Sequence, residues 1–177
     1  MIVHIIGASG SGKSTLGKAL SEKTGLPLLS SDHYLWPDSE FKTPRPVSRR
    51  VLMLKKDMEE NPSFILEGGI SWFAPNAFSP DLIILLRCEN TLRLRRLCER
   101  ETMRYGNWQD PSHPHHQLTR EFLSWCTLYE KAGYDEPNSL CSHMRLLSQS
   151  SCPCVILQNS GDIPSLVKKA RACLELI

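Results

Sequence analysis

The stretch GASGSGKST, residues 7–15, follows directly on the apolar run Ile2–Ile6. It has the spacing Gly-x4-Gly-Lys-Ser, from Gly7 to Ser14, which is the pattern of a phosphate-binding loop. The apolar run before the loop predicts a buried strand, and residues 13–23 after it suit a helix. Strand, loop and helix together predict that this part of the chain binds a nucleoside triphosphate.

The residue types of the loop explain how it would hold phosphates. Glycines let the backbone turn so that successive N–H groups point at phosphate oxygens, and the helix N-terminus adds its positive end. Lys13 can bridge the β- and γ-phosphates, and the Ser14 hydroxyl can ligate Mg²⁺. The residues expected to bind ATP here are Gly7, Ala8, Ser9, Gly10, Ser11, Gly12, Lys13, Ser14 and Thr15.

The composition sets bounds on the partners. With 177 residues, 41% of them hydrophobic and 23% charged, the chain is typical of one globular domain over residues 1–177. Its formal net charge of +2 is too small to favour nucleic acid or an anionic membrane as the main partner. No apolar run approaches the roughly 20 residues of a membrane span, and the N-terminus lacks the basic segment of a secretory signal. An odd number of cysteines, seven, fits reduced thiols, so we expect a cytoplasmic protein. We expect a monomer or a homodimer.

Strands and helices alternate along the rest of the chain. Further strands are predicted near residues 26–30, 63–67, 81–87 and 153–158, and helices over about 48–60, 90–104, 118–132 and 139–147 and after residue 163. The nearly continuous apolar run 81–87 is typical of a strand buried on both faces. The pattern predicts a doubly wound α/β sheet with helices on both sides.

Motifs that are absent narrow the class of nucleotide-binding protein. The chain contains neither the Asn-Lys-x-Asp string that reads guanine nor the Leu-Ser-Gly-Gly-Gln signature of transporter ATPases. It is also too short for the core and helical lid of a typical remodelling ATPase. Small-molecule kinases remain, and the notable features beyond the loop fit them.

Two acidic residues follow predicted strands, at the edge of the sheet where ligands of parallel sheets bind. Asp32 could orient or deprotonate an acceptor hydroxyl, although Ser30-Ser31-Asp32 is also simple turn chemistry. Glu67, followed by Gly68 and Gly69, could hold Mg²⁺ through water while the glycines let a substrate approach the backbone. Its alternative is a solvent-facing strand end.

Arginines repeat along the predicted helix 90–104. Arg93, Arg96, Arg100 and Arg104 are three, four and four residues apart, so they share one helix face. Such a stripe can close over a transferring phosphoryl group and neutralise its charge, with Arg93, Arg96 and Arg100 as catalytic candidates. A solvated charged face is the alternative.

The pieces GASGSGKST, SSDHYLW, FILEGG, DLIILLRCENTLRLRRLCERE and CPCVILQNSGDIPSLVKKA follow one another in a familiar order. In them the chain resembles the nucleoside and nucleotide kinase-like branch of P-loop proteins, the adenylate-kinase and shikimate-kinase group. The resemblance implies a P-loop NTPase fold whose five parallel strands run in the order 2-3-1-4-5, sandwiched by helices. It also implies an acceptor-binding insertion at 33–60, a lid at about 90–116, and an adenine border that includes Gly161. The acceptor contacts it implies are Asp32, Trp36, Arg45, Glu67, Gly68 and Gly69, with Arg49 and Arg50 as further candidates.

The chain departs from the adenylate kinases after the third strand. Their Asp-Gly-x-Pro-Arg is replaced by residues 67–71, EGGIS, without the arginine that would read an acceptor phosphate. We therefore expect an ATP- and Mg²⁺-dependent phosphotransferase that moves the γ-phosphoryl group to a small-molecule hydroxyl or to a nucleoside or nucleotide. The missing arginine favours a nucleoside, sugar or other hydroxyl compound over a nucleoside monophosphate. The alternative is a regulatory ATPase or switch that acts through a protein partner. We read the histidines of 113–116 as a surface loop, and Trp125 as core or loop packing.

Overall fold

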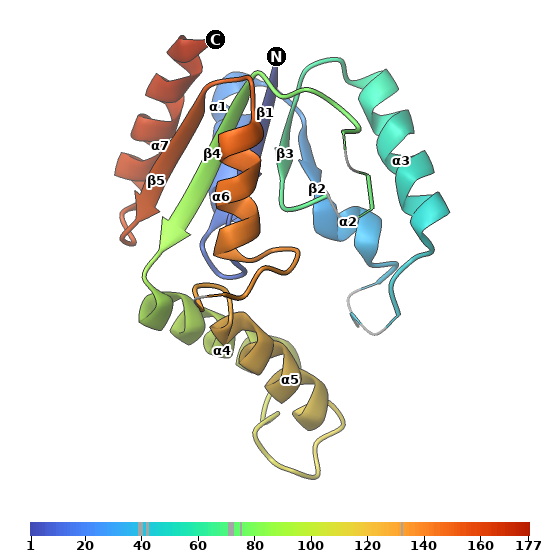
Figure 1. Cartoon of the computed structure of the whole chain (residues 1–177). Helices are drawn as coiled ribbons and strands as arrows, with labels where there is room; N and C mark the ends of the chain where they lie inside the picture. Colours follow the sequence, from blue (N-terminus) through green and yellow to red (C-terminus); the bar gives the residue numbers. More distant parts are fainter. Residues whose placement is uncertain (39–40, 42, 71–72, 75, 132) are drawn as a thin grey trace.

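Five parallel strands form the centre of the molecule (Figure 1). The computed structural model describes residues 1–38, 41, 43–70, 73–74, 76–131 and 133–177. The strands are β1 (Ile2–Ile6), β2 (Leu28–Ser30), β3 (Phe64–Glu67), β4 (Leu82–Cys88) and β5 (Cys154–Asn159). They run in the order β2-β3-β1-β4-β5, which confirms the predicted fold class and sheet order.

The strand register places the chemically important residues at one edge. Ser30 of β2 lies opposite Glu67 of β3, and Glu67 lies opposite Ile5 of β1. The phosphate loop begins at Gly7, two residues after Ile5. On the other side, Asn159 of β5 lies opposite Cys88 of β4. The carboxyl ends of the strands therefore meet where the loop and the predicted acidic residues are found.

Helices cover both faces of the sheet. The helices are α1 (Lys13–Thr24), α2 (Ser31–Leu35), α3 (Val47–Glu60), α4 (Asn90–Tyr105), α5 (His116–Thr127), α6 (Leu140–Gln149) and α7 (Ile163–Cys173). Helices α1 and α7 pack with the sheet around one apolar cluster, which includes Leu16, Leu20, Leu166 and Ala170. On the opposite face, α3 packs near β2 and β3, and α6 packs against β4. Helices α4 and α5 lie beyond the carboxyl end of β4, below the sheet in Figure 1.

The helix boundaries differ from the predictions in two places. Residues 31–35, which lie outside the predicted strands and helices, form the short α2. Tyr34 is fully buried there, and its hydroxyl donates to Asp57 Oδ2 of α3 at 2.8 Å. Helix α5 ends at Thr127, earlier than the apolar pattern indicated. Gly25 ends α1 in the left-handed conformation, φ 75°, as predicted. None of the helices that the described residues form is long and apolar enough to cross a membrane.

Candidate active site

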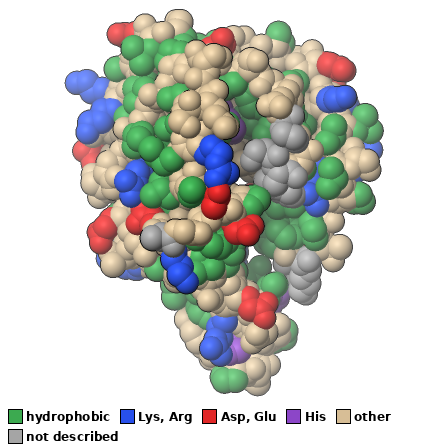
Figure 2. All heavy atoms as spheres, in the orientation of Figure 1, with side chains coloured by type: hydrophobic (Ala, Val, Ile, Leu, Met, Phe, Trp, Pro, Cys, Tyr) green, Lys and Arg blue, Asp and Glu red, His purple; other side chains and the backbone are tan. Residues whose placement is uncertain are grey.

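A cavity of about 1050 Å³ opens at the carboxyl ends of the strands. Its described walls come from the phosphate loop, α2, the end of β3, α4, α5 and α6. In Figure 2 a narrower lobe stands below the main body, and hydrophobic side chains gather where the two meet. The cavity therefore connects the phosphate loop with both the predicted lid region and the predicted acceptor-binding region.

The phosphate loop is held in shape by close contacts with α4. Gly10 has φ 80°, and a Cβ there would lie 2.8 Å from Leu97 Cγ and 2.9 Å from the Arg93 carbonyl oxygen. Only glycine fits a left-handed backbone at that distance. The helix therefore lies directly on the loop, and its side chains can reach phosphates bound there.

Lys13 rests on its own loop. Its Nζ donates to the Ala8 carbonyl oxygen at 2.9 Å. Burial lowers the pKa of Lys13, and the carboxylates of Glu67 and Asp32 oppose that shift. The ammonium therefore stands between the loop and the two acidic residues, which is where a β- or γ-phosphate would compete for it.

Glu67 and Asp32 reach the cavity in different ways. Glu67 is 5% exposed, and its Oε1 accepts from Ser30 Oγ at 2.5 Å. Asp32 is exposed in the first turn of α2 and also lines the cavity. Gly68, at φ 94°, brings α2 so close that a Cβ would lie 2.9 Å from Ser31 Cβ. Asp32 therefore combines a place in the first turn of a short helix with a place in the cavity wall.

The donor set fits a magnesium ion that is bound together with phosphates. Among the described residues no three His, Cys, Asp or Glu side chains cluster as a metal cage. Mg²⁺ usually takes one or two protein oxygens, the rest being waters and substrate phosphates. Ser14 and Glu67, which both line the cavity beside Lys13, offer such oxygens.

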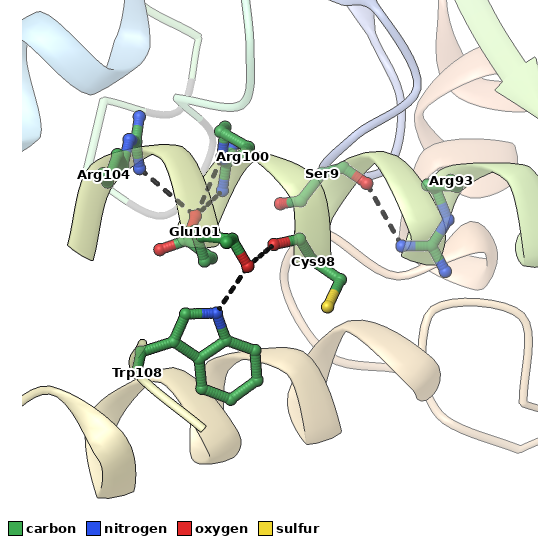
Figure 3. A network of polar contacts seen from close by, with 8 residues as sticks. Ser9, Arg93, Cys98, Arg100, Glu101, Arg104 and Trp108 are labelled. Carbon is green, nitrogen blue, oxygen red and sulfur yellow. Dashed lines mark hydrogen bonds and ion pairs between the residues drawn. The ribbon is translucent and has the colours of Figure 1, made fainter. Parts of the chain in front are cut away.

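Three of the four stripe arginines line the cavity: Arg96, Arg100 and Arg104. Glu101, only 4% exposed, joins two of them, because its Oε1 accepts from Arg100 Nε at 2.8 Å and from Arg104 Nη1 at 3.3 Å (Figure 3). Arg96 Nη1 lies 3.5 Å from Cys88 Sγ. The cavity thus holds one guanidinium group beside Cys88 at the end of β4 and two more held by one carboxylate.

Arg93 points elsewhere. It is 1% exposed and does not line the large cavity. Its Nη1 donates to the Ser9 carbonyl oxygen at 3.1 Å, and its Nη2 donates to Asn90 Oδ1 at 2.5 Å and to the Cys126 carbonyl oxygen at 2.8 Å. The side chain ties the phosphate loop to α4 and α5, and Figure 3 shows its contact with Ser9 of the loop.

The described residues of the insertion at 33–60 contribute rings rather than cations to the cavity wall. Trp36 and Phe41 line it, with ring centroids 5.7 Å apart. Arg45 does not, because its Nη1 donates to the carbonyl oxygens of His33 and Trp36 at the end of α2. Residues 39, 40, 42 and 71, which belong to the predicted insertion and the departing motif, lie outside the described residues.

Gly161 lies beside the cavity rather than in its wall. Its N–H donates to Asn159 Oδ1 at 2.9 Å, and a Cβ there would come 3.7 Å from Arg96 Nη2. The predicted adenine border therefore lies next to the arginine helix. Asn159 itself lines the cavity, and its Nδ2 donates to the Ser11 carbonyl oxygen at 2.8 Å.

Several lining residues were not singled out from the sequence. Asn159 could have been found by the rule that gave Asp32 and Glu67, since it ends a strand. Glu101 could not, because a single acid in an arginine-rich helix is usual. Trp125 and Leu118 are each 38% exposed and line the cavity, so the interpretation of Trp125 as core or loop packing was wrong. The buried residues of α5 are instead Thr119 and Cys126.

The sheet order, the loop and the cavity define a P-loop NTPase of the kinase-like fold. The family described as "AAA domain" matches residues 3–115, and the chain belongs to this family. "Uncharacterized protein YqaC" of Bacillus subtilis (strain 168) is 34% identical over 168 residues, 94% of this chain and 93% of that protein. A shikimate kinase of Paracidovorax citrulli (strain AAC00-1) is 32% identical over 124 residues, 68% of this chain and 65% of that protein.

Solved structures share the whole fold. The deoxyadenosine kinase from M. mycoides with bound dATP has a TM-score of 0.59 at 15% identity, covering 99% of this chain and 100% of that one. The shikimate kinase from Acinetobacter baumannii in complex with shikimate has a TM-score of 0.55 at 18% identity, covering 98% and 92%. Identities this low establish the fold alone. The resemblance to the P-loop kinase-like group is confirmed.

Proposed function

We propose that this protein is an ATP- and Mg²⁺-dependent kinase that transfers the γ-phosphoryl group to a hydroxyl of a small molecule. The observation that carries the proposal is one cavity with a phosphate-binding loop on one side and two carboxylates, Asp32 and Glu67, on the other. A loop that only bound or hydrolysed a nucleotide would not need a second, ring-lined space beside it.

The loop residues hold the nucleotide. Loop N–H groups and the N-terminus of α1 bind the phosphates, and Lys13 exchanges the Ala8 carbonyl oxygen for a β- or γ-phosphate oxygen. Ser14 and Glu67 would hold Mg²⁺, which when bound neutralises charge on the transferring phosphate. Ser30, by donating to Glu67, fixes the orientation of that carboxylate.

Asp32 receives the acceptor. A carboxylate in the cavity wall at the end of a strand can accept a hydrogen bond from the acceptor hydroxyl and orient its oxygen toward the γ-phosphorus. In the transfer the acceptor oxygen forms a bond to that phosphorus and the bond to the β-phosphate bridging oxygen breaks. The hydroxyl proton passes to the Asp32 carboxylate, and ADP leaves.

Arg96 and Arg100 stabilise charge on the transferring group from α4. Arg100 gives up part of its contact with Glu101 to do so. Arg93 serves as a positioning residue, because its donors already hold Ser9 of the loop and Cys126 of α5.

The proposal is tested with a library of metabolites and nucleosides, measuring stimulated ADP release and detecting the product by mass. ATP and GTP are compared as donors. We expect Asp32→Asn to abolish transfer while the Kd for ATP stays near the wild-type value. The matched control is Asp38→Asn, which removes an exposed carboxylate from the same segment outside the cavity wall.

Two results would contradict the proposal at different points. Transfer that survives in Asp32→Asn would show that Asp32 is not the base. ATP hydrolysis that no small molecule accelerates, together with a protein that co-purifies, would favour the regulatory ATPase instead.

A further inference from the structure

The positive charges among the described residues of the cavity wall come from two elements, α1 and α4. Among its described lining residues, the cationic side chains are Lys13 at the start of α1 and Arg96, Arg100 and Arg104 on α4. The strand ends, α2, α5 and α6 contribute none to the described wall. Two of these guanidinium groups lie over rings of the cavity wall: Arg104 is 4.6 Å from the centre of the Phe41 ring, and Arg100 is 5.5 Å from the centre of the Phe122 ring.

Two of these cations are already paired with a buried carboxylate. Arg100 and Arg104 share the buried carboxylate of Glu101. Lys13 donates to the Ala8 carbonyl oxygen of the loop, where a bound triphosphate would compete for it, and Arg96 lies beside Cys88 and Gly161. An acceptor with its own carboxylate or phosphate would meet Asp32 and Glu67 without a cation to balance it.

Two arginines of the insertion, Arg45 and Arg50, donate hydrogen bonds to backbone atoms of the same insertion. Arg45 donates to carbonyl oxygens at the end of α2, and the Arg50 Nε donates to the Arg45 carbonyl oxygen at 2.6 Å. Arg50 is 6% exposed, and its guanidinium lies 5.9 Å from the centre of the Phe73 ring. These side chains brace the segment, and neither lines the cavity.

Two histidines in the wall are uncharged at neutral pH. His4 Nε2 is hydrogen-bonded to the Gly68 carbonyl oxygen at 2.8 Å, and His143 Nδ1 to the Tyr129 hydroxyl at 2.8 Å. Burial lowers the pKa of His4 to about 4 and that of His143 to about 3. They offer neutral polar contacts and no positive charge.

A large part of the described wall is apolar and rich in rings. It comprises Leu35, Trp36, Phe41, Ile70, Leu118, Phe122, Trp125 and Leu146. Leu118 and Trp125 are each 38% exposed although they face the cavity. Side chains of this kind gain most when a flat or bulky apolar group covers them.

We infer that the acceptor is an uncharged hydroxyl compound with an apolar, ring-bearing body, which packs between α2 and α5 while its hydroxyl meets Asp32. This inference rests on the proposed kinase function and narrows it to one substrate class. The apolar body binds through its contact with the rings of the wall. The carboxylates of Asp32 and Glu67 repel anionic relatives of the same compound.

The first experiment compares three sets of acceptors in the ADP-release assay. The neutral ring-bearing set is 2′-deoxyadenosine, thymidine and salicin; the anionic set is shikimate, gluconate and dAMP; the polyol set is glucose and glycerol. We expect the highest kcat/KM in the neutral ring-bearing set, at least tenfold above the best anionic compound. A best acceptor from the anionic or polyol set would overturn the inference and leave the kinase function standing. No stimulation by any set, with ATP still bound, would count against both.

The second experiment moves a cation into the apolar wall. The double variant Leu118→Arg, Glu121→Gln places a guanidinium on α5 and removes the carboxylate three residues away that would pair with it. We expect the preference for neutral over anionic acceptors to fall at least tenfold. The matched control is Met103→Arg, Glu99→Gln, which makes the same changes on α4 outside the cavity wall, where Met103 is 87% exposed. An unchanged preference in the first variant, or an equal change in the control, would overturn the inference.

Discussion

Replacement of Arg93 by alanine tests whether this buried arginine supports the phosphate loop. Its guanidinium donates to the Ser9 and Cys126 carbonyl oxygens and to Asn90 Oδ1, at 3.1, 2.8 and 2.5 Å. It also lies 5.6 Å from the centre of the Tyr129 ring. Arg93→Ala would leave those carbonyl oxygens without their charged donor and a cavity where the side chain packed.

The expected loss of stability follows from these contacts. A hydrogen bond from a charged donor contributes about 1.5–3 kcal/mol, and two of the three acceptors are backbone atoms in buried or half-buried positions. We expect the free energy of unfolding to fall by about 3–5 kcal/mol, and the Tm by roughly 6–20 °C for a domain of this size. Arg93→Lys keeps the charge but not the geometry of a fork, so it should lose at least half as much.

The assay is urea unfolding followed by circular dichroism, with Arg95→Ala as the control on the same helix. The Arg95 side chain is 68% exposed and 3.8 Å from Glu99, so its loss should cost less than about 0.5 kcal/mol. Arg93→Ala within about 1 kcal/mol of the wild type would refute the structural role. A wild-type stability in Arg93→Lys, with transfer retained, would instead fit a role that needs only the positive charge.

Three further variants or conditions probe other parts of the site. Gly68→Ala should cost about 2–4 kcal/mol of stability in thermal melts, because its φ is 94° and a Cβ would overlap Ser31, whereas Gly69→Ala, with nothing within 4 Å, should cost less than about 1 kcal/mol. Glu101→Gln should lower the Kd for ATP about three- to tenfold at low salt, measured by titration calorimetry, since Arg100 and Arg104 lose their counter-charge; Glu99→Gln should not. His4 and His143 bind protons more weakly in the folded protein, so their contribution to stability is full above pH 6.5 and falls as the pH drops toward 4. The free energy of unfolding in urea should differ between pH 7 and pH 5 by about 1–2 kcal/mol for each histidine. His143→Phe should reduce that difference. Equal stability at pH 7 and pH 5 would show that the two rings are not buried as neutral groups.

The sequence predicted the sheet well because its signals are local. Apolar runs of strand length, each followed by a glycine or a polar turn, fix the strands, and the loop pattern fixes which strand is central. The rule that ligands bind at strand ends then gave Asp32 and Glu67, which the fold does bring to one cavity with Lys13. α2 was missed because a five-residue helix carries too little periodicity to be recognised.

The roles of the arginines could not be separated in the same way. Spacings of three and four residues predict that Arg93, Arg96, Arg100 and Arg104 share one face of α4. The spacing does not predict where along α4 the phosphate loop crosses the helix. The contact of Gly10 with Arg93 and Leu97 sets that point. At about 1.5 Å per residue, Arg100 lies roughly 10 Å further along the axis than Arg93. Arg93 is therefore covered by the loop and α5, while Arg100 and Arg104 reach the cavity.

The same reasoning explains why α5 was misjudged and why it matters for specificity. An apolar stripe indicates that a helix face avoids water, and a protein core and a substrate pocket satisfy that condition equally. In α5 the small buried residues Thr119 and Cys126 form the packed face, and the larger Leu118 and Trp125 turn toward the cavity. Large apolar side chains left 38% exposed beside a phosphate loop are costly to keep unless something covers them. The body of the acceptor we propose would cover them, because the phosphates of the nucleotide are expected at the phosphate loop.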